Sequence, residues 1–265
     1  MPNAKPGRLP TAPAAMLLSL TLSVPCAPCA AQSSLGPPPG IPATVHLARG
    51  VDDPIIDFSS AMVREAYARL GITATDEVPS GERVLKALNA GEFFGDIVHI
   101  EGFDRMYPNL VRIPVPLITY YAMAVTDGRL LPIKTWADLS PYRVCIKRGV
   151  KSIDMMTKSL PHRIVAAEYA PLFRMLRVGR CEVAVVPQSA WLQPERFEMK
   201  GMRTLEPPLQ SWPLYHHVHK SNSAIVPLLQ RVLQDMAKSG YLEQQRAQYQ
   251  QRLEKSQREA GITGR

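Results

Sequence analysis

The chain has 265 residues, of which 46% are hydrophobic and 20% are charged, and these values are ordinary for a folded globular protein. They exclude a globally disordered chain, and the length allows either one large domain or two smaller ones. The net charge of +8 is spread along the sequence, so nucleic-acid binding is not predicted. A mild preference for anionic ligands, or for an acidic membrane surface, explains the charge as well.

The start of the chain has the pattern of a secretory signal peptide. A positively charged beginning is followed by the apolar stretch Ala14–Val24 and then by small residues. The apolar stretch is too short to span a membrane, and no other stretch approaches that length. We therefore predict that residues 1–31 are removed on export, that residues 32–43 form a linker, and that the mature protein is soluble in the periplasm.

The first part of the mature chain alternates strand and helix patterns. The predicted strands are Thr44–Arg49, Ile72–Val78 and Asp96–Ile100, and the predicted helices between them are Ser59–Leu70 and Ser80–Ala90. This β-α-β-α-β order indicates a parallel sheet whose strands are connected by crossover helices.

The same order recurs between Trp136 and Ala190. Three short apolar runs, Tyr142–Lys147, Arg163–Ala167 and Glu182–Val186, have the length of buried strands, and the segments between them read as helices. Two similar lobes are therefore predicted. Ligands of open parallel sheets lie just beyond the carboxyl ends of the strands, so the loops at these ends are candidate binding loops.

Two extended stretches, Leu117–Val125 and Leu214–Lys220, are predicted to cross between the lobes. A helix capped by Ser223 follows the second stretch, with its apolar residues on one side. Tyr241–Leu253 is predicted to be a charged, glutamine-rich helix. Ser256–Arg265 is predicted to be a mobile polar tail.

Cysteine and histidine residues raise two further questions. Cys145 and Cys181 lie in or beside neighbouring predicted strands, so a disulfide is geometrically possible, but two buried free thiols are favoured. His216, His217 and His219 suggest a metal at first sight. On a strand only His217 and His219 share a face, and no third ligand is evident, so no metal and no other cofactor is predicted.

Several features follow one another in a fixed order: a secretory signal, a small α/β lobe, WADL before a strand, a basic loop with a glycine, LRVGRCEVAVV, LYHHVHKSN, and a long amphipathic helix that ends in MAKSGY. This order resembles that of the family 3 periplasmic solute-binding proteins, whose best-known members serve ABC importers of polar amino acids. The resemblance covers nearly all of the mature chain. It implies an α/β fold of the type II periplasmic binding class, in which two lobes joined by two hinge strands close on a ligand.

On this resemblance, residues 44–120 and 216–255 form lobe 1, residues 121–215 form lobe 2, and residues 256–265 are the mobile tail. The C-terminal helices are expected to pack back on the first lobe. Ligand would lie in the cleft between the lobes.

Loops at the strand ends and one crossing strand would face that cleft. The candidate ligand-binding residues in them are Asp52, Asp53, Glu101, Arg105, Tyr120, Arg148, Lys151, Ser152, Gln188 and Ser189. In amino-acid-binding members an arginine clamps the ligand carboxylate, and a carboxylate of the second lobe holds the ammonium group. Arg105 is outside the usual Ser/Thr-rich setting, and Gln188 stands where that acid is expected. The predicted ligand is therefore broader, a small polar or anionic metabolite that is either an amino acid or an organic acid.

The sequence contains no G-x-S-x-G, P-loop, G-x-G-x-x-G or H-E-x-x-H motif, which favours binding over catalysis. We predict a monomeric, non-enzymatic receptor that captures a small molecule and delivers it to the permease of an ABC importer. Two alternatives stay open. One is a periplasmic lyase similar to cyclohexadienyl dehydratase, with Glu101 or Asp53 as the acid–base group, and the other is a receptor that presents its ligand to a membrane sensor kinase.

Overall fold

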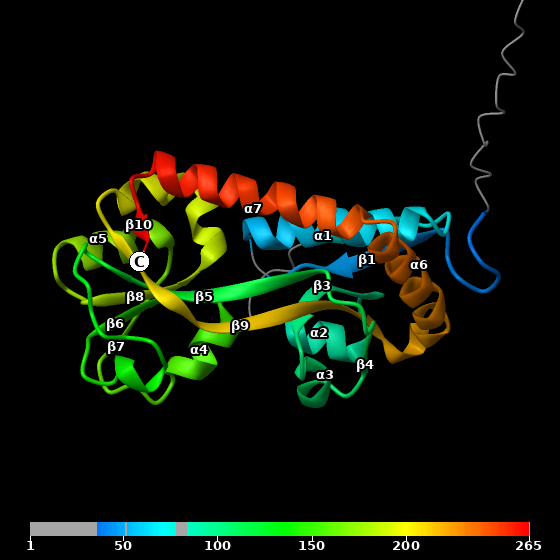
Figure 1. Cartoon of the computed structure of the whole chain (residues 1–265). Helices are drawn as coiled ribbons and strands as arrows, with labels where there is room; N and C mark the ends of the chain where they lie inside the picture. Colours follow the sequence, from blue (N-terminus) through cyan, green and yellow to red (C-terminus); the bar gives the residue numbers. More distant parts are fainter. Residues whose placement is uncertain (1–35, 51, 78–83, 265) are drawn as a thin grey trace, which may run out of the picture. The chain divides into compact units, whose positions relative to one another are not determined.

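Two groups of parallel strands make up the fold (Figure 1). The computed structural model describes residues 36–50, 52–77 and 84–264. The first strand group contains β1 (Thr44–Ala48), β2 (Thr73–Glu77) and β3 (Gly95–Ile100), with helices α1 (Pro54–Ala68), α2 (Val84–Ala90) and α3 (Phe103–Met106). The second contains β6 (Val144–Lys147), β7 (Arg163–Ala166) and β8 (Val183–Pro187), with helices α4 (Lys151–Thr157) and α5 (Tyr169–Arg177). In each group the first strand lies between the other two and is parallel to both, as predicted.

Two long antiparallel strands, β5 (Ile118–Thr126) and β9 (Arg203–His219), run between the two groups (Figure 1). β9 is antiparallel to β3 of the first group, and β5 is antiparallel to β8 of the second. The hydrogen-bonded order is therefore β2-β1-β3-β9-β5-β8-β6-β7, with one parallel group on either side of the crossing pair. The short strand β4 (Leu110–Arg112) also pairs with β9. The predicted crossing stretches Leu117–Val125 and Leu214–Lys220 thus lie in, or largely within, two longer strands.

Helix α1 shows how the local sequence positions a strand-end loop. It begins at Pro54 rather than at the predicted Ser59, because Asp53 caps it and proline is compatible with the first helical turn. The side chain of Asp53 accepts a hydrogen bond from the Ile55 amide at 3.0 Å. The apolar face of the helix, which includes Met62 and Tyr67, is buried in the large hydrophobic core. The cap therefore holds Asp53 at the end of the loop that follows β1.

Four short 3₁₀ helices and three C-terminal elements complete the described chain. The 3₁₀ helices are η1 (Ala137–Leu139), η2 (Gln188–Leu192), η3 (Pro194–Met199) and η4 (Lys220–Ile225). The C-terminal elements are α6 (Val226–Lys238), α7 (Tyr241–Glu259) and β10 (Thr263–Gly264). Among the helices described, none combines the length and the apolar composition that crossing a bilayer requires.

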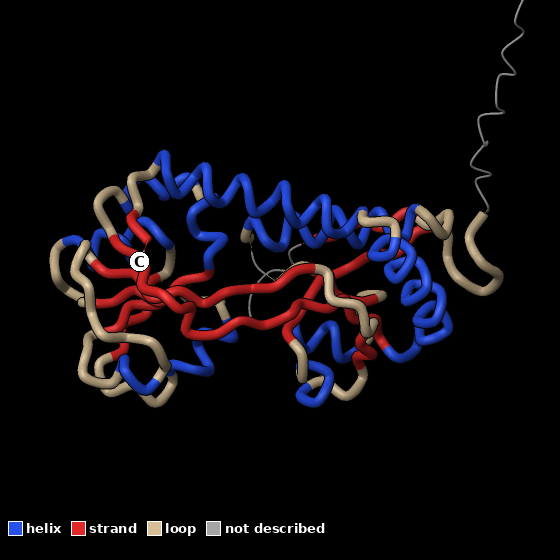
Figure 2. Tube along the Cα trace, in the orientation of Figure 1, coloured by secondary structure: helices blue, strands red, loops and turns tan. Residues whose placement is uncertain are grey.

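The C-terminal segment differs from the prediction. α7 continues to Glu259, and the hydroxyl of its buried Ser256 donates a hydrogen bond to the Trp191 carbonyl of η2. Beyond the helix Ile262 is buried, and β10 pairs in parallel with the start of β9. The prediction of a mobile polar tail is therefore wrong up to Gly264. Figures 1 and 2 show α7 passing over both strand groups, so the helix is not restricted to the first lobe.

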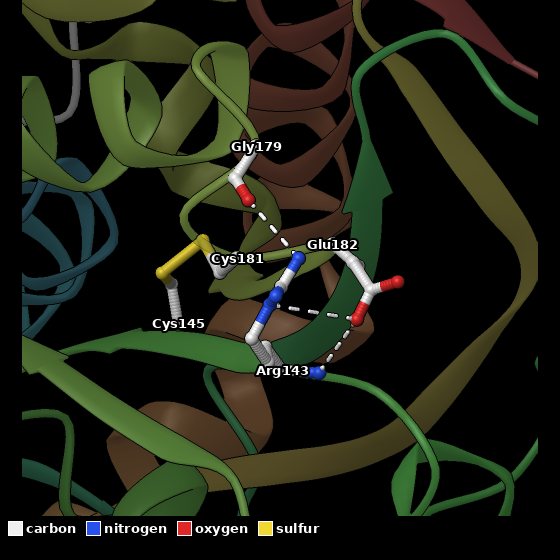
Figure 3. Close-up of a disulfide and its surroundings, with 5 residues drawn as sticks. All are labelled: Arg143, Cys145, Gly179, Cys181 and Glu182. Atoms are coloured by element: carbon white, nitrogen blue, oxygen red, sulfur yellow. Dashed lines mark hydrogen bonds and ion pairs between the residues drawn. A yellow bond between two sulfur atoms is a disulfide. The ribbon is translucent and has the colours of Figure 1, made fainter.

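A disulfide joins Cys145 of β6 to Cys181, which lies just before β8 (Figure 3). β6 and β8 are neighbours in the sheet, and the two Cα atoms are 5.9 Å apart, which is within the range that a disulfide spans. Beside the bridge, Arg143 donates a side-chain hydrogen bond to the Gly179 carbonyl, and its backbone amide donates to the Glu182 carboxylate. The prediction that favoured two free thiols is wrong, because the chain that enters β8 brings Cys181 beside Cys145 of the neighbouring strand β6.

Candidate functional site

Asp53 is the point at which the loops of the two strand groups meet. It follows β1 of the first group, and its side chain is buried, with 5% exposure for the residue. Oδ2 of Asp53 lies 3.4 Å from the hydroxyl of Tyr169, which is the first residue of α5 in the second group. Ser189, which follows β8 of the second group, is near enough to influence the same carboxylate. The predicted convergence of strand ends is therefore present around Asp53.

The electrostatics of Asp53 are unusual for a surface-loop carboxylate. Burial raises the pKa of the Asp53 carboxyl, and this effect outweighs Ser189, the Ile55 amide and the positive charge of Lys147, which all lower it. Lys147, at the end of β6, does not form an ion pair with Asp53. Its ammonium group lies 3.8 Å from Glu168 and 5.0 Å from the centre of the Tyr169 ring. The site thus contains a carboxylate with little compensation and a nearby cation.

Tyr120 of β5 extends this cluster along the crossing strands. Its hydroxyl accepts a long hydrogen bond from Ser152 of α4 at 3.4 Å. Burial raises the pKa of Tyr120, and the negative charge of Asp53 raises it further, while Ser152 lowers it. The ring of Tyr120 lies 5.4 Å from that of Trp212 in β9, which in turn lies 6.3 Å from Trp136. The Tyr120 hydroxyl therefore lies close enough to be affected by the Asp53 charge, and a row of aromatic rings continues from it along the crossing strands.

A small pocket adjoins the cluster on the side of α7, and we call it the hinge pocket. It spans about 180 Å³ of space outside the protein atoms, open solvent included, and leaves about 10 Å³ for a water-sized group. Its lining residues are Ile55, Thr119, Tyr120, Tyr121, Gln188, Ser189, Tyr249 and Leu253. The pocket shares Tyr120 and Ser189 with the Asp53 cluster, so the C-terminal helix borders the same region of the molecule.

The structure brings half of the predicted ligand-binding residues together and separates the rest. Those in the Asp53 cluster or the hinge pocket are Asp53, Tyr120, Ser152, Gln188 and Ser189. Asp52 is an exposed partner of Arg49, and Glu101 forms an ion pair with Arg112 at 2.7 Å. The remaining three side chains are exposed: Arg105, Arg148 and Lys151. As ligand contacts, all ten remain predictions.

The candidate set omitted three residues that the structure places at the cluster. Lys147 is the last residue of the predicted strand Tyr142–Lys147, and neither Tyr169 nor Tyr249 is among the ten candidates. Tyr169 had a usable signal, because it opens the helix after β7 and so lies at the same edge of the sheet as the other loops. Tyr249 had none, because a tyrosine in a glutamine-rich helix gives no indication of what that helix covers.

The histidines of β9 serve the interior of the first strand group. Nε2 of His216 lies 3.0 Å from the Tyr67 hydroxyl, and Nδ1 lies 3.2 Å from the Ile97 carbonyl. Burial lowers the pKa of His216 to about 4. The backbone amide of His217 donates to the buried Asp96 carboxylate at 3.1 Å. In the part of the chain that the structure describes, no cluster of three or more His, Cys, Asp or Glu side chains is arranged to hold a metal ion.

Two β-α-β groups, two crossing strands and strand ends that meet at one buried carboxylate define the type II periplasmic binding fold, so the predicted two-lobed α/β fold is confirmed. An ancestral arginine-binding protein bound to glutamine has this fold, with a TM-score of 0.61 and 15% identity over 77% of this chain and 96% of that chain. The substrate-binding protein of an amino acid ABC transporter superposes with a TM-score of 0.59 and 16% identity, over 76% of this chain and 96% of that chain. A histidine kinase sensor domain with similarity to periplasmic binding proteins superposes with a TM-score of 0.60 and 17% identity, over 77% of this chain and 95% of that chain.

In sequence, an uncharacterized protein of Shewanella oneidensis is 24% identical to this chain over 199 residues, which are 72% of this chain and 75% of that protein. No protein-family model matches the chain. These similarities show the fold.

Proposed function

We propose that this protein is an extracytoplasmic receptor that captures a small polar metabolite between its two lobes and delivers it to an ABC importer. The observation that carries the proposal is the buried Asp53 carboxylate at the meeting point of the two lobes, where its hydrogen-bonding neighbours are hydroxyl groups and a backbone amide and the nearby Lys147 pairs with Glu168 instead. Buried carboxylates are normally paired, and a bound ligand with a donor or a cationic group supplies the missing partner.

The charged groups at the site narrow the range of ligands that would bind. Asp53, beside the Tyr169 hydroxyl, attracts a cationic or hydrogen-bond-donating group, and Lys147, over the face of the Tyr169 ring, attracts an anionic one. A zwitterion such as an amino acid satisfies both. A dianionic organic acid places a second negative charge beside Asp53, which is unfavourable. Of the two ligand classes predicted from the sequence, the amino-acid class therefore has the better support.

Thermal denaturation with a panel of amino acids, amines and organic acids tests the proposal. A ligand that binds only the folded state raises the melting temperature by mass action. Asp53→Asn is expected to abolish the response, whereas Asp52→Asn, which changes the exposed neighbouring carboxylate, is expected to retain it. A panel that shifts nothing contradicts the receptor function, and an unchanged response of Asp53→Asn contradicts this location of the site.

The remaining elements of the proposal concern place and partners. The periplasmic-binding-protein fold supports a periplasmic location after removal of residues 1–31, which lie outside the described residues. We place the lobe boundaries as predicted, with residues 44–120 and 216–255 in lobe 1 and residues 121–215 in lobe 2. A permease of an ABC importer is the proposed partner, and a monomer is the proposed state. Genes for a permease and an ATPase beside this gene would support import. Size-exclusion chromatography measures the oligomeric state.

Two other functions have specific support. The similarity to a sensor domain of a histidine kinase favours a receptor that reports its ligand to a membrane kinase, and a kinase gene in place of transporter genes would indicate it. The raised pKa of Asp53 suits an acid–base group of a lyase. Incubation with arogenate or prephenate tests the lyase, and an absence of product removes it. Glu101, the other candidate for that role, is exposed and paired with Arg112.

A further inference from the structure

The hydroxyl of Tyr249 is buried in the wall of the hinge pocket without a hydrogen-bond partner among the described residues. Tyr249 is 4% exposed, and Ser189, whose hydroxyl lies beside the Asp53 carboxylate, is 2% exposed. The Tyr249 hydroxyl is therefore a buried polar group that lines the pocket without a partner in the described part of the chain.

Buried polar groups in folded proteins are almost always hydrogen-bonded, because the loss of water is otherwise uncompensated. The fully buried Tyr67 follows this rule, since its hydroxyl lies 3.0 Å from Nε2 of His216. Tyr249 does not follow it, and its ring has little freedom to seek a partner elsewhere. The ring packs against Phe58 at 5.1 Å, and the guanidinium of Arg252 lies over it at 5.6 Å.

The lining of the hinge pocket determines what kind of group it accepts. Hydroxyl groups, the Gln188 amide and apolar side chains form the wall, and no ionisable acid or base other than tyrosine is among the lining residues. Burial raises the pKa of Tyr249, so its hydroxyl stays protonated and can donate as well as accept. The room for a water-sized group is only about 10 Å³, which is space for about one small polar group, so the pocket suits the tip of a ligand and not a whole one.

We propose that the hinge pocket is a subsite for an uncharged hydrogen-bonding group of the ligand, such as an alcohol or a carboxamide, and that Tyr249 is a specificity-determining residue in it. This inference rests on the receptor function proposed above. It assigns to α7, which follows both crossing strands in the chain, a direct contact with ligand. The charged groups of the ligand remain at Asp53 and Lys147, and its neutral end extends toward α7.

Paired probes that differ in one neutral polar group test the subsite. The pairs are L-homoserine with L-2-aminobutyrate, L-glutamine with L-norvaline, and ethanolamine with ethylamine, and calorimetry gives the dissociation constant of each. For wild-type protein the alcohol or carboxamide member is expected to bind more tightly than its partner. Tyr249→Phe is expected to weaken that member by roughly three- to tenfold, about the value of one hydrogen bond, and to leave the partner unchanged.

A measurement without ligand complements this test. Tyr249→Phe removes a hydroxyl that has no partner, so its melting temperature is expected to equal or exceed that of the wild type. Tyr67→Phe removes a hydroxyl that is hydrogen-bonded to His216, so this control is expected to melt at a lower temperature and to keep the wild-type preference within each probe pair.

The outcomes separate the two proposals. If no probe binds wild-type protein, the receptor function with an amino-acid or amine ligand fails, and the subsite fails with it. If probes bind but Tyr249→Phe keeps the full preference for the alcohol or carboxamide, only the subsite is overturned. A melting temperature of ligand-free Tyr249→Phe as low as that of Tyr67→Phe also overturns the subsite, because the hydroxyl would then have a partner within the protein.

Discussion

The hydroxyl of Tyr169 lies 3.4 Å from Oδ2 of Asp53 and so joins the two lobes directly at the candidate site. The hydroxyls of Ser152 and Tyr120 are also 3.4 Å apart. Hydrogen bonds of this length are weak. A ligand that enters between these groups can therefore replace them with shorter bonds at little cost in free energy. This property agrees with a cleft that exchanges internal contacts for ligand contacts.

Asp53→Asn is expected to be at least as stable as wild-type protein at pH 7. Burial raises the folded-state pKa of Asp53 above its ordinary value of 3.8, so the folded state binds more protons than the unfolded state. The contribution of this carboxyl to stability therefore decreases as the pH rises from 3.8 through the folded-state pKa. Urea unfolding of both proteins at pH 4 and pH 7 measures the effect. If the free energy of unfolding changes by the same amount between pH 4 and pH 7 in both proteins, the raised pKa of Asp53 is contradicted.

Asp53→Ala separates the charge from the helix cap. Asparagine retains the oxygen that accepts from the Ile55 amide, whereas alanine removes it. We expect the alanine variant to be less stable than the asparagine variant by about 1 kcal/mol, the usual cost of losing an N-cap. Equal stability of the two variants in urea would show that the cap contributes nothing.

Acidification is expected to destabilise the first strand group through His216. Burial lowers its folded-state pKa from 6.5 to about 4, so the unfolded state binds more protons in this range and stability falls as the pH decreases from 6.5 toward 4. Between pH 6.5 and pH 5 the loss is at most about 2 kcal/mol. His216→Gln should lose less stability over this interval than wild type, while the exposed control His162→Gln should behave as wild type. Identical pH profiles for all three proteins would contradict the assignment.

Removal of the disulfide is expected to destabilise the second lobe strongly. Cys145 and Cys181 are separated by 36 residues in the chain. A closed loop of that length lowers the entropy of the unfolded state, which stabilises the folded state by about 4 kcal/mol at 25 °C. The measurement is denaturant unfolding of wild type and of the double variant Cys145→Ala/Cys181→Ala. Addition of a reductant should destabilise only the wild type. An unchanged unfolding midpoint of the double variant would exclude a stabilising bridge.

Ile262→Ala tests whether the C-terminal segment belongs to the folded unit. Ile262 is 6% exposed, and truncation of a buried isoleucine costs about 2–4 kcal/mol. Leu130→Ala is the matched control, because Leu130 is 71% exposed and its truncation should change the free energy of unfolding little. If both substitutions are neutral, the segment behaves as the mobile tail that the sequence suggested.

The sequence predicted the parallel strands well because buried strands such as β6 and β8 are short apolar runs with clear limits. It failed at the C-terminus for a compositional reason. Glutamine and arginine dominate α7, so the buried positions Leu253, Ser256 and Ala260 were not recognised as one continuing helical face. The disulfide could not be decided, because the sequence gives the separation of two cysteines along the chain and not their separation in space.

The candidate site shows a similar limit. Asp52 and Asp53 are adjacent and chemically identical, yet one is exposed beside Arg49 and the other is buried at the meeting point of the lobes. The start of α1 makes the difference, because Asp53 is the residue that caps the helix, and its side chain is turned toward the Ile55 amide. Arg148 and Lys151 are candidate ligand-binding residues by their place in a strand-end loop, but their side chains are exposed. The direction of each side chain therefore determined which of the predicted site residues lie together, and a loop sequence does not specify that direction.

α7 has a mechanical consequence for the movement of the lobes. It is attached to the first lobe where Tyr249 packs on Phe58 of α1, and near the second where Ser256 bonds to Trp191 of η2. Two extended strands alone permit bending and twisting in several directions. A helix is stiff along its length, so these two attachments hold their spacing fixed and leave tilting of one lobe about an axis near α7 and perpendicular to it as the least restricted motion. The lobes should therefore separate mainly at the edge remote from this helix.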